Sequence, residues 1–208
     1  MILIGQFDSP FVRRVGIALR LYGMAFEHRP WSAFSDADRI AAFNPLCRVP
    51  VLVMADGAAL IDSAAMIDAL DHLVGPARAL IAPGGPARHR DLRRIALATG
   101  LADKAVALFY ETAMHESPAA PWVARLQRQV AGALDALEAE RAASIGFWSG
   151  SPVPGHADIA LGCVLHFLEG AHPTLFDRHR HPALADHTAA CEALPVFADT
   201  HQAFIPPR

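Results

Sequence analysis

Ser9 and Pro10 mark a position where this chain could hold an anion. They follow an apolar run from Met1 to Phe7, which predicts a buried strand, and they precede a segment whose apolar residues have helical spacing. Serine is a preferred N-cap and proline a preferred first helical residue, so the pair predicts the start of a helix. The unpaired N–H groups and partial positive charge of a helix N-terminus would stabilise a thiolate beside the Ser9 hydroxyl. The alternative is that Ser9 only caps the helix.

Asp62 and Ser63 form a second polar pair at a predicted helix start, because the segment from Ala64 to Leu73 again has helical spacing. Such a site can bind both ends of an amino acid. Ser63 and its N–H would bind the α-carboxylate, and Asp62 would bind the α-ammonium. The alternative is a routine N-cap.

The cysteines and histidines predict neither a disulfide scaffold nor a metal site. Cys47, Cys163 and Cys191 are far apart and form no C-x-x-C pair, which is typical of a reducing compartment. The run His179-Arg180-His181 stands in a basic loop and is a poor metal-ligand pattern. We therefore expect no metal.

The composition indicates a globular protein with a substantial core. The chain has 208 residues, 53% of them hydrophobic, and a net charge of −3 with acids and bases interspersed. This balance disfavours nucleic acid and an anionic membrane surface as partners. No apolar run approaches the ~18 residues of a membrane helix, and no secretory signal is recognised, so we expect no membrane partner and a cytoplasmic location.

The first part of the chain alternates predicted strands with predicted helices. The strands are expected at residues 1–7, 25–31, 49–54 and 58–61, and the helices at 11–21, 35–43 and 64–73. Asp56-Gly57 between two apolar runs predicts an antiparallel hairpin. The predicted order is β-α-β-α-β-β-α.

The rest of the chain has helical patterns only. Helices are expected at 91–111, 122–141, 158–168 and 182–194, with an extended tail at 204–208. The helix at 158–168 is apolar almost all round, which is typical of the middle of a bundle. Prolines and glycines separate the two patterns. We predict an α/β domain at 1–76, a linker at 77–87 and an all-helical domain at 88–208.

Four motifs, in order, resemble those of the glutathione S-transferase family, and the likeness covers nearly the whole chain. They are Ser9-Pro10-Phe11-Val12-Arg13, Asn44-Pro45-Leu46-x-x-Val49-Pro50-Val51-Leu52, Leu60-x-Asp62-Ser63-x-x-Ile67 and Gly155-x-Ala157-Asp158-Ile159. The first motif is most similar to that of a small bacterial branch of the family. The resemblance implies a thioredoxin-like N-terminal domain followed by a helical bundle that binds the second substrate.

The resemblance implies that glutathione is the co-substrate and that Ser9 is the catalytic residue. The related thioredoxin fold carries C-x-x-C where this chain has Ser9 to Val12, so the protein cannot form a disulfide of its own there. A thiol supplied by glutathione would have an ordinary pKa of ~8.5, and a helix N-terminus can lower that pKa by a unit or more. Ser9 would then stabilise the thiolate, with Phe11 among the glutathione-binding residues.

The resemblance also implies a cis peptide bond between Val49 and Pro50. A cis bond would turn the N–H and C=O of Val49 outward, where they could pair with the cysteinyl unit of glutathione as an added strand does. The alternative is an ordinary proline at the start of an edge strand. By the same resemblance, Arg48 would reach the glycyl carboxylate, and Asp62 with Ser63 would bind the γ-glutamyl group.

Three residues of the first long C-terminal helix, Phe109, Tyr110 and Met114, are expected to form the wall of the electrophile site. The alternative is that these side chains are plain core. On the same helix Asp103 could contact glutathione across a dimer interface, as in some relatives, or could simply be a solvated acid.

Two residues depart from the family pattern. Cys47 stands where the family more often has glycine or another small residue, so the conformation of that loop is in question; a catalytic role for Cys47 is an alternative that no predicted helix N-terminus supports. Gly155 stands where relatives often have a Ser or Thr cap, and Asp158 is expected to complete a capping box as a structural residue.

The working hypothesis is a glutathione transferase that activates the glutathione thiolate for attack on a small electrophile. One alternative is another glutathione-dependent enzyme, an isomerase or a peroxidase, which would share the same cofactor residues. Another is a catalytically silent binding module with the same fold. A homodimer is expected from the resemblance alone.

Overall fold

The computed structural model describes residues 1–206. Its strands are β1 (Ile2–Ile4), β2 (Glu27–Arg29), β3 (Val51–Val53) and β4 (Ala59–Ile61), and its first three helices are α1 (Pro10–Leu21), α2 (Ala37–Ala41) and α3 (Ser63–Val74). The helices that follow are α4 (Gly85–Met114), α5 (Ala120–Ala142), α6 (His156–Ala171), α7 (Pro182–Glu192) and α8 (Pro195–Ala198). The protein therefore has a thioredoxin-like β-α-β-α-β-β-α domain followed by an all-helical domain, as the sequence predicts.

The four strands form one mixed sheet in the order β2-β1-β3-β4. The β1–β2 pair is parallel, whereas β1–β3 and β3–β4 are antiparallel. The predicted hairpin joins β3 to β4, and Gly57 in its turn has φ 88°, which glycine adopts without steric cost. The strands are shorter than expected, but their order along the chain is the predicted one.

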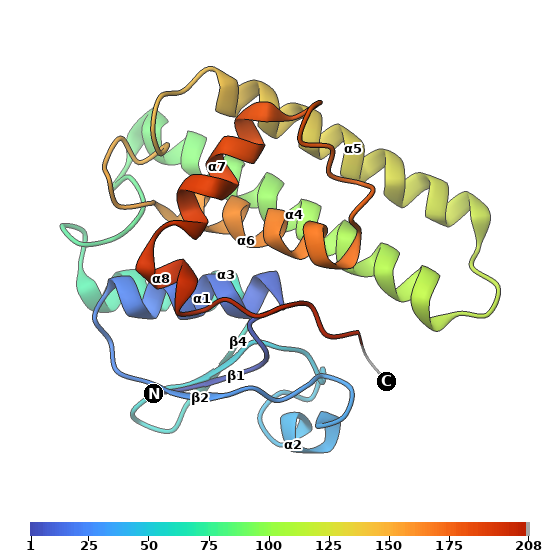
Figure 1. Ribbon diagram of the computed structural model, residues 1–208. Helices are drawn as coiled ribbons and strands as arrows, with labels where there is room; N and C mark the ends of the chain where they lie inside the picture. The colour runs from blue at the N-terminus through green and yellow to red at the C-terminus, as the bar shows by residue number, and fades with distance from the viewer. Residues whose placement is uncertain (207–208) are drawn as a thin grey trace.

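The side chains of β1 and β3 alternate between two faces of the sheet. Leu3 and Leu52 are fully buried in the cluster formed with α1 and α3. Ile4 and Val51 belong to a different cluster, which includes Ile40 of α2. Figure 1 shows the result, with α1 and α3 on one side of the sheet and α2 on the other. Because successive residues face opposite sides of the sheet, a shift of one residue would move these buried side chains to the wrong face. The alternation therefore fixes the register of the strands on which α1 packs.

Helix α1 lies between the sheet and the helical domain (Figure 1). Its boundaries follow from local signals, because Ser9 is the N-cap, Pro10 is in the first turn, and Gly23 follows the C-cap with φ 68°. On the side away from the sheet, the fully buried Ile17 packs with Ile159 of α6. The helix that follows Ser9 is thus packed against both domains.

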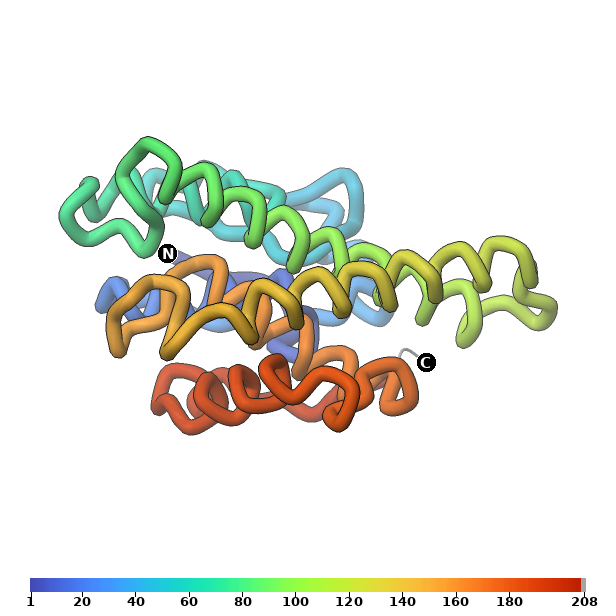
Figure 2. Tube along the Cα trace, turned by 90° about the horizontal axis from the view of Figure 1, so that it is seen from above, coloured from blue at the N-terminus to red at the C-terminus, as the bar shows by residue number. Residues whose placement is uncertain are grey.

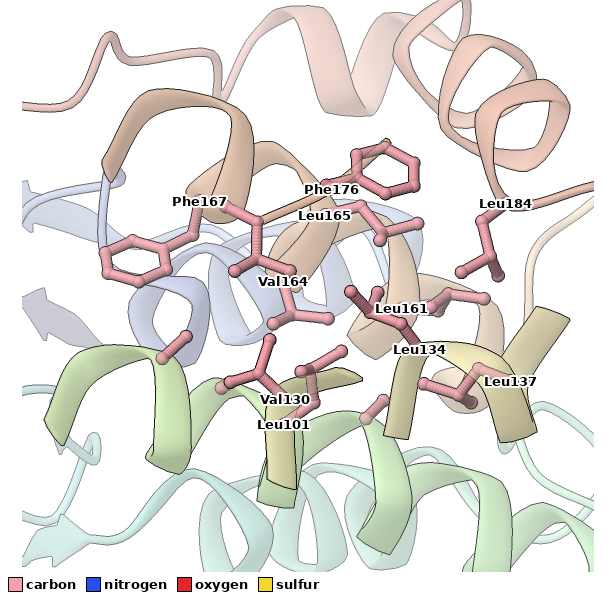
Figure 3. Close-up of a cluster of buried hydrophobic side chains, with 14 of the residues drawn as sticks. Leu101, Val130, Leu134, Leu137, Leu161, Val164, Leu165, Phe167, Phe176 and Leu184 are labelled. Atoms are coloured by element: carbon pink, nitrogen blue, oxygen red, sulfur yellow. The ribbon is translucent and has the colours of Figure 1, made fainter. Parts of the chain in front are cut away.

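Helix α6 is the centre of the helical domain, as its apolar sequence predicts. Leu101 of α4, Val130 and Leu134 of α5, and Leu161 and Leu165 of α6 belong to one buried cluster (Figure 3). At the start of α6, the Asp158 carboxylate accepts hydrogen bonds from Gly155 N–H at 3.0 Å and from Trp148 N–H at 2.8 Å. Asp158 is therefore structural, as expected.

Helix α4 is longer than the predicted helix at 91–111, since it runs from Gly85 to Met114. Its start lies inside the segment that the sequence assigns to a linker. From the sequence, the prolines of this segment indicate a linker. Pro86, however, stands in the first turn of α4, where the helix needs no N–H donor and the fixed φ of proline is compatible with a helix. Figure 2 shows α4 and α5 side by side, with the connection between them extending beyond the rest of the molecule.

The C-terminal tail returns to the N-terminal domain. Residues 201–206 have no regular secondary structure, and residues 207 and 208 of the predicted extended tail lie outside the described part of the chain. Within residues 1–206, no helix combines the length and the hydropathy that crossing a bilayer requires.

A buried polar network joins α1, α3 and α6, and it should make stability depend on pH. Asp71 accepts hydrogen bonds from Tyr22 Oη and from His156 Nε2, the latter at 2.8 Å. Burial acts to raise the pKa of Asp71, but the bonds from His156 and Tyr22 outweigh burial and hold this pKa below its usual 3.8.

Because folding lowers the pKa of Asp71, its ionised form stabilises the protein above pH ~4, and this contribution is lost as the pH falls below that value. We expect Asp71→Asn to be less stable than wild type at neutral pH and to lose less stability on acidification. Urea unfolding of both proteins at neutral pH and near pH 3 measures this difference. If both proteins lost the same free energy of unfolding between neutral pH and pH ~3, the role of ionised Asp71 would be contradicted.

Candidate functional site

Two adjoining cavities lie where the starts of α1 and α3 meet α4. The smaller has a volume of about 270 Å³ and the larger about 640 Å³. They share Phe11, Arg48, Val49 and Asp103 in their walls, so they form one continuous cleft. The smaller cavity contains Asp62 and Ser63, whereas the larger contains Ser9. The three regions that the sequence singles out therefore meet in this cleft.

Ser9 lies in the larger cavity at the N-terminus of α1. It is the N-cap, with extended backbone angles, and its Oγ accepts a long hydrogen bond of 3.5 Å from Val12 N–H. The hydroxyl proton remains available as a donor. Together with the positive end of a 12-residue helix, this geometry suits stabilisation of an anion in the cavity.

The peptide bond between Val49 and Pro50 is cis, as the resemblance implies. Among residues 1–206, no group hydrogen-bonds to the N–H or the C=O of Val49, and this residue lines both cavities. The loop before it is held by buried Asn44, which donates to Arg48 C=O at 2.8 Å and accepts from Leu46 N–H at 3.0 Å. Val49 therefore offers a free backbone donor and acceptor to an extended ligand.

Cys47 has φ 50°, in the left-handed region that glycine adopts most easily. A glycine would adopt this conformation without steric cost, which is a physical reason for the glycine that the resemblance leads one to expect at this position. The side chain is exposed and lines the larger cavity.

Asp62 and Ser63 begin α3, as predicted, and their backbone is unusual. Asp62 has φ 72° and ψ 125°, a sparsely populated region for a residue other than glycine, and its carboxylate accepts from Ala64 N–H at 2.7 Å. Strain of this kind concentrates at functional sites and is not required for ordinary capping. Ser63 is buried, and its Oγ accepts a hydrogen bond of 3.3 Å from Nη1 of Arg14.

Arg48 and Asp103 stand at the junction of the two cavities, and both are exposed. Arg48 lies next to Val49, where a guanidinium can reach a carboxylate at the end of a bound peptide. Asp103 comes from α4 of the same chain. It lines both cavities of its own chain.

Phe109 and Tyr110 of α4 form part of the wall of the larger cavity. Their rings contact edge-to-face, with centroids 6.3 Å apart. Burial raises the pKa of Tyr110, so its hydroxyl stays protonated at neutral pH and can donate a hydrogen bond. Met114 is not in the wall; it is 48% exposed in the last turn of α4, which extends past the cleft. Met114 therefore does not line the larger cavity, because the helix continues beyond it.

Much of the remaining wall comes from segments that sequence reasoning did not assign to the site. Trp31 and Phe34 come from the connection after β2, and Phe204 comes from the tail. The tail is held in place by Asp8, whose carboxylate accepts from Ile205 N–H at 3.0 Å. Burial raises the pKa of Asp8 above its usual value, because its effect is larger than that of the backbone hydrogen bonds, which act to lower this pKa.

The histidine run at 179–181 serves structure. His181 Nε2 lies 3.1 Å from Asp135, and its Nδ1 lies 3.1 Å from Asp177 C=O. Within residues 1–206, a different group, His166, Glu192 and His201, has ligand atoms within 4.8 Å of one another. Glu192 already accepts two hydrogen bonds from Arg13, so its carboxylate is engaged in an ion pair.

The chain matches known proteins along most of its length. Residues 8–73 match the glutathione S-transferase N-terminal domain, and residues 120–190 match the C-terminal domain. Among curated proteins, the probable glutathione S-transferase BZ2 of Zea mays is 30% identical over 94% of this chain and 90% of its own length.

Two similar solved structures were determined with ligands. A glutathione S-transferase of Methylobacterium radiotolerans, in complex with glutathione sulfonate, is 32% identical with a TM-score of 0.89 and covers 100% of this chain and 98% of its own. A glutathione S-transferase of Methylobacillus flagellatus with GSH bound is 28% identical with a TM-score of 0.86, and the match covers 96% and 98% of the two chains. By its motifs, its fold and these comparisons, the chain belongs to the glutathione S-transferase family.

Proposed function

We propose that this protein is a glutathione transferase that binds glutathione along the cleft and activates its thiol at Ser9. The observation that supports this most is the convergence of two helix N-termini on either side of a free backbone segment at Val49. That arrangement fits a ligand with a thiol, an extended peptide backbone and a charged amino-acid end. The ligands found with the similar structures support the same assignment.

Each part of glutathione has a position in this proposal. The cysteinyl sulfur lies at the Ser9 hydroxyl, and the cysteinyl backbone pairs with Val49. The γ-glutamyl group extends into the smaller cavity toward Asp62 and Ser63, while Arg48 receives the glycyl carboxylate. The cis bond to Pro50 orients Val49, and Phe11 lies in the wall between the two cavities.

The reaction in this proposal is attack of the thiolate on an electrophile in the larger cavity. The Ser9 hydroxyl and the N-terminus of α1 stabilise the sulfur anion, which raises the fraction of nucleophile at neutral pH. Phe109, Tyr110 and Phe204 provide an apolar wall that holds the electrophile near the sulfur. Rate enhancement comes from this positioning and from the favoured thiolate.

Calorimetric titration with glutathione, followed by assays with an aryl halide and an enone, tests the proposal. We expect binding at micromolar to millimolar glutathione and formation of the thioether conjugate. No heat at millimolar glutathione would favour a silent binding module instead. Binding together with peroxide reduction or double-bond isomerisation, but without conjugation, would favour the other glutathione-dependent enzymes.

A further inference from the structure

Three side chains of metal-binding type come together in the helical domain. His166 belongs to α6, Glu192 is the last residue of α7, and His201 follows α8. Their ligand atoms all lie within 4.8 Å of one another. The group joins three segments that are far apart in the sequence, so no motif of neighbouring residues indicates it.

The distances within this group are close to those between two ligands of one metal ion. Nδ1 of His166 lies 3.6 Å from Oε1 of Glu192, and Nδ1 of His201 lies 3.9 Å from Oε2 of the same carboxylate. Zinc binds imidazole nitrogen and carboxylate oxygen at about 2.0–2.2 Å, so two of its ligands at a tetrahedral angle lie about 3.4 Å apart. The His201 side chain is 58% exposed, and a small rotation of its ring would close the remaining gap.

The hydrogen bond that His166 makes leaves the nitrogen facing Glu192 free to bind a metal. Nε2 of His166 lies 3.1 Å from Gln202 C=O, which can only accept, so Nε2 carries the proton. In the neutral ring Nδ1 then has a lone pair, and it stands next to the Glu192 carboxylate. Two acceptors placed in this way repel each other unless a cation or a proton lies between them. Metal-binding histidines commonly donate their other N–H to a backbone carbonyl, as His166 does.

Arg13 orients the Glu192 carboxylate without using all of its lone pairs. The guanidinium donates to the two carboxylate oxygens at 2.7 and 2.8 Å. An ionised carboxylate has about four lone-pair positions, so each oxygen keeps one for another partner. Hydrogen bonds of this kind commonly hold ligating carboxylates in place. The positive charge of Arg13 also repels a cation, so we expect micromolar rather than nanomolar affinity.

We propose that His166, Glu192 and His201 bind a transition-metal ion of the zinc class, which fixes the beginning of the C-terminal tail to α6 and α7. Two imidazoles and one carboxylate suit zinc, whereas magnesium and calcium prefer oxygen ligands alone. Water would complete the coordination, because His201 opens the site to solvent. Phe204 and Ile205 of the same tail line the larger cavity, so the ion would also steady that wall. Metal binding here does not depend on the proposed function.

Calorimetric titration of the full chain with zinc chloride, and with magnesium chloride in parallel, tests the proposal. The protein carries no histidine tag and is first freed of metal with EDTA. The titration is run at pH ~7.5, where a histidine with an ordinary pKa of ~6.5 is neutral. We expect one zinc ion per chain at micromolar concentration and no magnesium binding in that range. Zinc should also raise the melting temperature, because the ion binds the folded protein. No zinc binding at micromolar concentration, or equal binding of magnesium, would overturn the proposal.

His201→Gln is the decisive variant, because this exposed side chain can be replaced without unfolding the protein. It should weaken zinc binding at least about 100-fold, the upper end of what is lost when a residue behind a ligand is replaced. The partly buried His166 should give the same loss on replacement by glutamine. His89→Gln, which replaces an exposed histidine of α4, is the matched control and should bind zinc as wild type does. Wild-type affinity in His201→Gln, or equal weakening in His89→Gln, would mean that zinc binds scattered surface histidines and would overturn the proposal.

Hydrogen exchange measures whether the ion fixes the tail. Zinc should slow exchange of the Ile205 N–H, which donates to Asp8 at 3.0 Å, in wild type and not in His201→Gln. The Gly57 N–H in the turn between β3 and β4 serves as the reference and should exchange at the same rate with and without zinc. Zinc binding that leaves exchange of the tail unchanged would contradict the fixing role.

Discussion

Replacing Ser9 with alanine is expected to lower kcat/KM for conjugation by about 100-fold, with little change in KM for glutathione. The Ser9 hydroxyl is the donor placed at the start of α1 in the larger cavity. A positioned donor to a reacting anion typically contributes 10²–10³ in rate. The pKa of the bound thiol should rise toward its free value of ~8.5, because the thiolate loses this hydrogen bond. Ultraviolet absorbance of the thiolate across a pH titration measures the shift.

Ser9→Ala also removes the cap contact with Val12, so stability needs a separate control. Loss of an N-cap side chain costs ~1 kcal/mol, which leaves the protein folded at the assay temperature. Ser144→Ala, which removes a hydroxyl bonded to Glu140 C=O at the end of α5, should alter neither the thiol pKa nor the rate. Wild-type values for both quantities in Ser9→Ala would remove the role assigned to Ser9.

Replacing Arg13 with methionine is expected to destabilise the protein by about 3 kcal/mol, the lower end of the cost of breaking a buried ion pair. The Arg13 side chain is fully buried and Glu192 is 26% exposed, so the carboxylate left behind regains part of its hydration. The pair joins α1 to the last residue of α7. The change therefore weakens the contact between the two domains, and urea unfolding measures it.

The neighbouring substitution should have the opposite sign. Arg14→Met is expected to stabilise the ligand-free protein, because Arg14 is buried and pairs with no carboxylate within residues 1–206. A double-mutant cycle with Glu192→Gln should show strong coupling for Arg13 and near-additivity for Arg14, because Arg13 contacts Glu192 and Arg14 does not. If the two substitutions changed the free energy of unfolding equally, the presence of a carboxylate partner would not determine how much each arginine contributes to stability.

The sequence predicted those parts of the fold that local chemistry specifies. The start of α1 at Ser9-Pro10, its end before Gly23 and the hairpin at Gly57 each depend on residues next to one another in the chain. The order of strands and helices then follows from apolar periodicity. The cis bond before Pro50 came from the family resemblance, because a proline permits a cis bond without requiring it.

The parts of the site that the sequence did not predict depend on contacts between distant segments. Arg14 is an ordinary helix residue until the fold places it beside Ser63, 49 positions away. Phe204 belongs to the wall because the tail crosses back to the cleft, where Ile205 N–H meets Asp8, 197 positions away. Met114 was expected in the wall together with Phe109 and Tyr110, but the cavity ends before the turn of α4 that carries it.

A crystal structure of the protein with bound glutathione tests the central claim most directly. We expect the cysteinyl sulfur within ~3.5 Å of Ser9 Oγ, the cysteinyl backbone paired with Val49, and the γ-glutamyl group in the smaller cavity beside Ser63. A tripeptide bound with its sulfur away from Ser9, or with its γ-glutamyl group outside the smaller cavity, would contradict it.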